Sequence, residues 1–171
     1  MSLELRDAFD NLELLDSAGQ VPAPLPVREM LQHTVTAQTL AIGTTLLAGE
    51  LVTRIGTDPS QEQSRAVSQM ATAVTHISAA AHHFAQTART AASPAPRAGT
   101  AQADHRTGAM VIDHATARRE LRRASESIDA AGRHLKEHHE IQRFLAAMRR
   151  PAPQPPPPPS RTCPGPSSKG L

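Results

Sequence analysis

Apolar side chains recur every three or four residues through the middle of this chain, and this spacing limits the folds open to it. In residues 59–92 the row consists of Val67, Met70, Val74, Ile77, Ala81, Phe84 and Ala88. These positions follow the a and d positions of a heptad repeat, which lie on one face of a helix and pack against another helix. The segment is therefore predicted to be a long helix with coiled-coil-like packing.

Two further segments carry the same spacing and predict long helices at about 26–55 and 110–148. The first has two apolar rows, Ala37, Leu40, Leu47 and Leu51 in one and Leu31, Val35, Ile42 and Leu46 in the other. Because each row needs a partner to cover it, we expect this helix to have two neighbours. The last segment has the row Leu121, Ala124, Ile128, Ala131, Leu135 and His138, which continues with a drift to Ile141, Leu145 and Met148.

The connection between the first two long helices contains helix stop and start signals. Gly56 favours the left-handed conformation that ends a helix, Asp58 is a candidate N-cap, and Pro59 suits the first helical position. Gln61, three residues after Asp58, could complete a capping box. So short a connection predicts antiparallel neighbours. Residues 93–109 are small and polar, and they predict a mobile linker.

The fold class predicted from these patterns is all-α, an elongated antiparallel three-helix bundle spanning residues 27–150. Three phenylalanines, no tyrosine and no tryptophan favour helix over strand. Residues 1–18 predict a short amphipathic acidic helix, and residues 19–26 a proline-containing linker. The proline-rich residues 151–171 predict a disordered tail.

Charge, cysteine content and hydropathy bear on the cellular location of the protein. The formal net charge is +2, and the single cysteine, Cys163, cannot form an internal disulfide. The segment from Met30 to Gly49 has no charge, but its threonines and glutamines make it too polar for a predicted membrane span. Sixteen arginines against two lysines, with 29 alanines, are typical of a GC-rich bacterial genome. We therefore expect a cytoplasmic bacterial protein with no membrane contact.

Histidines supply the weak candidates for a metal site. His134 and His138 lie four residues apart, so one ion could in principle contact both from one helical face. His139 or Glu137 could supply a third ligand, but both are expected to point elsewhere on the same helix, and flanking core positions are the more ordinary interpretation. We expect no cofactor and no small-molecule substrate. Because no nucleophile–base or phosphate-binding pattern occurs, the chain is predicted not to be an enzyme.

A second group of polar residues is basic. Arg118, Arg119, Arg122 and Arg123 lie opposite the apolar row of the last helix. A solvated helix face is the ordinary interpretation. The alternatives are contact with an acidic partner, such as the N-terminal segment, or with nucleic-acid phosphates.

The tail contains two proline motifs of the kind that aromatic grooves bind. Arg150, Pro153 and Pro156 fit one pattern, and Pro156, Pro159 and Arg161 fit the other. An inert spacer is the competing interpretation. Taken together, these features predict a non-catalytic helical interaction protein, an adaptor or accessory subunit that binds a protein partner or itself. The alternative is a nucleic-acid-associated accessory protein that uses the arginine face.

Overall fold

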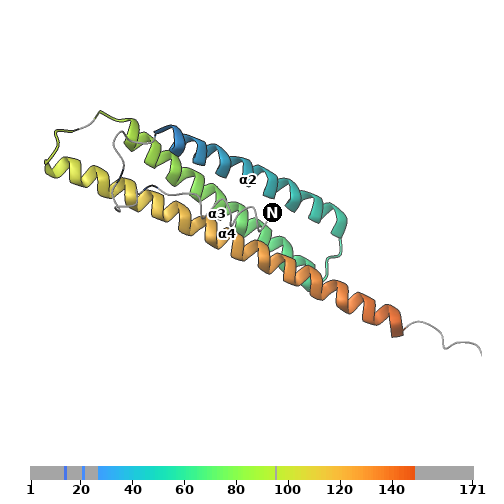
Figure 1. Ribbon diagram of the computed structural model, residues 1–171. Helices are drawn as coiled ribbons and strands as arrows, with labels where there is room; N and C mark the ends of the chain where they lie inside the picture. The colour runs from blue at the N-terminus through green and yellow to red at the C-terminus, as the bar shows by residue number, and fades with distance from the viewer. Residues whose placement is uncertain (1–13, 15–20, 22–26, 95, 149–171) are drawn as a thin grey trace, which may run out of the picture.

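Three long helices make up almost all of the part of the chain that the structure describes. A computed structural model describes residues 14, 21, 27–94 and 96–148, and within these ranges it contains no strand. The helices are α2 (Val27–Ile55), α3 (Gln61–Ala92) and α4 (Ala101–Met148). They run up, down and up beside one another (Figure 1). The all-α prediction is confirmed.

Helix α3 lies at the centre of this arrangement. It contacts α2 and α4 along its length, whereas the Cα atoms of α2 and α4 do not come within 8 Å of each other. The main core cluster joins Ala37 of α2, Ile77 and Phe84 of α3, and Leu121 of α4. Alanines fill most of the remaining core positions, so the helices can approach one another closely.

The buried face of α3 differs in part from the predicted row. Met70, Ile77, Ala81, Phe84 and Ala88 are buried as expected, but Val67 and Val74 are half-buried. The neighbouring residues Ala66, Ala73 and Ala80 are completely buried instead. The reason is that α3 faces two neighbours, so its buried face is wider than one coiled-coil seam and the small residues occupy the closest approach.

The helix start after the first connection lies two residues later than predicted. Gly56 adopts the expected positive φ of 76°, but the N-cap is Ser60 rather than Asp58. The Ser60 hydroxyl accepts from the Gln63 N–H at 3.2 Å, and the Ser60 N–H donates to the Gln63 side chain at 2.9 Å. Because this capping box satisfies both groups, Pro59 precedes the cap instead of beginning the helix.

The predicted mobile linker over residues 93–109 is wrong for its second half. Helix α4 begins at Ala101, after Gly99 turns the chain at φ 75° and the Thr100 hydroxyl accepts from the Ala103 N–H. Arg106 explains why this polar segment is helical. Its guanidinium donates to the carbonyl oxygens of Ala91, Ser93 and Pro94 at 2.9, 2.7 and 3.0 Å. These carbonyls lie at the end of α3, where a helix cannot satisfy its own acceptors.

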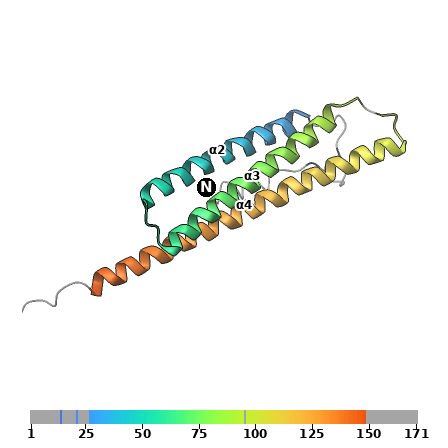
Figure 2. The same cartoon turned by 180° about the vertical axis from the view of Figure 1, so that it is seen from behind.

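Helix α4 continues past the connection between α2 and α3 (Figure 2). His138 of α4 contacts Ser60, the N-cap of α3, and residues 139–148 are all exposed. The predicted apolar row therefore loses its partner here. Phe144 and Met148 are 64% and 70% exposed.

Most of the predicted terminal segments lie outside the described residues. This applies to the acidic helix at 1–18 and the linker at 19–26, except for Leu14 and Val21, and to the tail at 151–171. Leu14 is buried against Met30, Ala91 and Met110. One apolar position of the predicted N-terminal helix thus packs on the bundle.

We expect Arg106→Ala to lower the free energy of unfolding by about 1–3 kcal/mol, because it removes charged hydrogen bonds to three carbonyl groups. Urea unfolding measures this change, and hydrogen exchange should show residues 101–109 opening first. Arg97→Ala, at an exposed position of the same connection, is the control. An unchanged unfolding midpoint for Arg106→Ala would contradict this account of the start of α4.

Candidate functional site

Histidine–carboxylate pairs join α3 to α4 along one side of the bundle. We call Glu62–His134, His76–Glu120 and His83–Asp113 the histidine ladder. The nitrogen–oxygen distances are 2.8, 2.7 and 3.1 Å, and every member is partly buried. A step of seven residues along α3, from His76 to His83, corresponds to seven residues back along α4, from Glu120 to Asp113. This is the heptad register of an antiparallel helix pair.

Sequence reasoning found one member of this ladder, His134, and missed its partners. The heptad spacing of His76 and His83 on one helix and of Asp113 and Glu120 on the next was the available signal. It becomes informative once the antiparallel pairing of the two helices is combined with their register.

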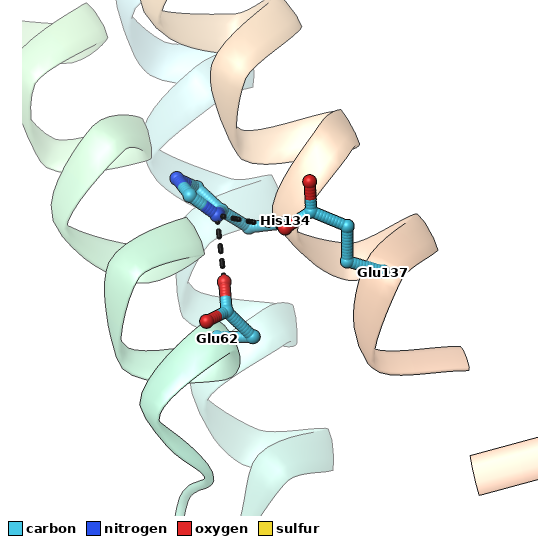
Figure 3. Close-up of side chains that lie close together, drawn as sticks. All are labelled: Glu62, His134 and Glu137. Carbon is cyan, nitrogen blue, oxygen red and sulfur yellow. Dashed lines mark hydrogen bonds and ion pairs between the residues drawn. The ribbon is translucent and has the colours of Figure 1, made fainter. Parts of the chain in front are cut away.

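His134 lies in the one cluster with metal-ligand character found among the described residues (Figure 3). Its Nδ1 is 2.8 Å from a Glu62 oxygen and 3.6 Å from a Glu137 oxygen. All three candidate ligand atoms lie within 4.8 Å of one another. One histidine and two carboxylates can hold a divalent ion, but the same contacts form an ordinary ion pair when the imidazole donates a proton.

His138, the other residue of the weak metal prediction, is not a member of this cluster. His138 Nδ1 instead lies 3.1 Å from the hydroxyl of Ser60, the N-cap of α3. Glu62 and Glu137 occupy the positions beside His134. The two histidines are four residues apart on one face of α4, but they have different partners: His134 pairs with Glu62 of α3, and His138 contacts the N-cap residue of α3.

A second histidine cluster lies inside the bundle and was not predicted. His114 of α4 is 4% exposed, and its ring lies 5.5 Å from Phe84 and 6.4 Å from His33 between centroids. Its Nε2 has no hydrogen-bond partner. Burial, followed by the charges of His33 and Arg118, lowers the pKa of His114 to about 4. Burial also lowers the pKa of His33. Both rings therefore favour the neutral form in the folded state.

The predicted basic face is partly occupied by an acidic neighbour. Arg119 and Arg123 lie 3.8 and 3.1 Å from Glu120, which also pairs with His76. Arg118 is half-buried, whereas Arg122 is exposed. Contact between this face and nucleic acid or an acidic partner stays a prediction.

The outer side of α2 carries the largest set of unpartnered apolar side chains on that helix. We call Leu31, Val35, Ile42 and Leu46 the outer stripe; they are 52, 60, 63 and 66% exposed. These residues form the second apolar row predicted from the sequence. No described helix covers this second row, since α3 contacts the opposite side of α2, where Ala37 and Thr44 are buried.

By length and composition, α2 would also be able to cross a membrane, and little of its apolar part is buried in the bundle, unlike the core helix of a soluble protein. The expected lack of membrane contact therefore stays a prediction. The proline motifs at Arg150, Pro153, Pro156, Pro159 and Arg161 lie outside the described residues. No protein-family model, curated protein or solved structure matches the chain.

Acid should destabilise the fold through His114. Because its folded-state pKa lies below the ordinary value of 6.5, the stability gained from the neutral ring is complete above pH 6.5 and is lost as the pH falls toward 4. The loss amounts to at most about 3 kcal/mol. We expect His114→Leu to flatten this part of the stability profile, measured by urea unfolding at several pH values. The control is His139→Gln, at an exposed position, which should leave the stability profile unchanged. A His114→Leu protein that loses as much stability in acid as the unaltered protein would contradict the assignment to His114.

The ladder pair Glu62–His134 should show energetic coupling in a double-mutant cycle with Glu62→Gln and His134→Gln at pH 6. We expect about 0.5–1 kcal/mol, because the pair is partly exposed. Urea unfolding of the four proteins gives the value, and the exposed pair Lys136–Glu140 provides a comparison that should be near zero. Equal coupling energies in the two cycles would show that the ladder pair stabilises the fold no more than an exposed ion pair does.

Proposed function

We propose that this chain is a non-catalytic helical interaction protein, an adaptor or accessory subunit, that binds through the outer stripe of α2. The observation that carries the proposal is the exposure of Leu31, Val35, Ile42 and Leu46 on one side of a helix whose other side packs on α3. Exposed apolar side chains gathered on one side of a helix commonly mark contact surfaces.

The spacing of the stripe fits a helical partner. Residues separated by four and seven positions lie along one side of a helix, which is how amphipathic helices present anchors to a groove or to another helix. Gln38 and Thr39 lie between the two halves of the stripe and add polar groups that can fix its orientation. We favour protein over lipid because threonine, glutamine and histidine are distributed through the helix.

The predicted terminal segments belong to the same proposal. We place residues 1–18 as a short helix beside the bundle, supported by the burial of Leu14 against Met30 and Met110. The proline-rich residues 151–171 serve as a spacer or as a ligand for an aromatic groove. Their contribution is separate from that of α2, and a chain ending at Arg150 retains the whole outer stripe.

A photo-activated cross-linking residue at Val35, introduced into the full chain in its own cells, tests the proposal. We expect irradiation to yield protein adducts, whether with another protein or with a second copy of this chain. The matched control carries the same residue at Thr36, which is exposed but faces away from the stripe. The absence of any protein adduct at Val35, or equal adducts at both positions, would contradict the proposal.

A further inference from the structure

The residues of the outer stripe are arranged symmetrically about the middle of α2, and this symmetry favours one of the partners that the proposed function allows. Measured from the midpoint between Gln38 and Thr39, Leu31 and Leu46 lie equally far along the helix, and so do Val35 and Ile42. Large aliphatic side chains therefore occupy mirrored positions. Figures 1 and 2 show α2 at one edge of the bundle, with α4 on the far side of α3.

We propose that the occupant of the outer stripe is the α2 helix of a second copy of this chain, packed antiparallel about a two-fold axis at that midpoint. A two-fold interface uses the same patch on both subunits, so the patch must complement itself. In this pairing Leu31 of one copy meets Leu46 of the other, and Val35 meets Ile42. The inference rests on the proposed function and specifies its partner.

The charges at the two ends of the stripe support the antiparallel arrangement. No charged residue lies between Met30 and Gly49, so the centre of the interface contains no like-charge contact. Arg28 precedes the stripe and Glu50 follows it, and both are exposed on the same flank of the helix. Glu50 also lies 3.6 Å from Arg54 of its own helix. The two-fold axis brings Arg28 of one copy beside Glu50 of the other, twice per dimer. A parallel pairing would instead place Arg28 of both copies at the same level and on opposite flanks, away from Glu50.

The size of the stripe sets the expected strength of the dimer. From Leu31 to Leu46 the helix is about 22 Å long. Two helices packed over this length bury an area on the order of 1,000 Å², which is near the lower limit for a specific interface. We therefore expect a reversible dimer at micromolar concentrations.

Sedimentation velocity of the purified full chain between 1 and 100 µM tests the inference. We expect the dimer fraction to rise over this range. Val35→Lys should shift the midpoint at least tenfold toward higher concentration without changing the helical circular dichroism, because Val35 is exposed in the single chain. Thr36→Lys adds the same charge off the stripe and should dimerise like the unaltered protein.

Two further sets of variants examine the register. Arg28→Glu and Glu50→Arg should each weaken the dimer, and the two changes in one chain should restore it. In a Cys163→Ser background, Leu31→Cys protein mixed with Leu46→Cys protein should form a disulfide between the two species. A disulfide that joins two copies of the Leu31→Cys protein, in the absence of the Leu46→Cys protein, would overturn the antiparallel arrangement.

A chain that stays monomeric at 100 µM would overturn the second-copy inference. If the Val35 cross-linker still captured a foreign protein, the proposed interaction function would stand. If neither experiment detected a protein, both would fail. Co-sedimentation of the chain with vesicles of neutral and anionic phospholipid, abolished by Val35→Lys but not by Thr36→Lys, would assign the stripe to lipid and reject the dimer.

Discussion

The close approach of α3 to both of its neighbours is the constraint on which the rest of the structure depends. Ala66, Ala73 and Ala80 are completely buried on α3, and their small side chains allow the helix axes to lie near one another. Alanine also contributes little apolar area, so this packing gives a thin core with Phe84 as its largest side chain. Because α3 occupies the middle position, α2 has neither α3 nor α4 over its outer side.

The histidine ladder supplies what an alanine-lined seam lacks, which is a preferred register between α3 and α4. Small apolar residues pack almost equally well when one helix slides along another by a heptad. A shift of one heptad reduces the three polar pairs to one. Sliding α4 in one direction keeps only a His76–Asp113 pair and places His83 opposite Arg106, and sliding it in the other keeps only a His83–Glu120 pair and places Glu62 opposite Ile141. Flanking polar positions determine register in coiled coils for the same reason.

The sequence predicted three long helices correctly because the apolar rows of α2, α3 and α4 are long and periodic. It placed the start of α4 too late because residues 101–109 have no apolar row, and their helix depends on Arg106 reaching carbonyl groups in another segment. It placed the first N-cap at Asp58 because Asp58 and Ser60 are both good caps, and the return bond from Gln63 decides between them.

The candidate sites were less predictable, since they depend on contacts between helices. The outer stripe could be read directly as a second apolar row. The pairing of His134 with Glu62 could not be read from spacing within one helix, and neither could the burial of His114 beside His33 and Phe84. These contacts required the antiparallel order and the register together.

The C-terminal end of α4 projects beyond the other two helices. From His138 to Met148 the helix advances about 15 Å without support from α3. A helix this short, without tertiary contacts, is only marginally stable in water. Because residues 139–148 are exposed and do not pack on α3, this end can unwind turn by turn without opening the bundle, and the helix can shorten toward His138.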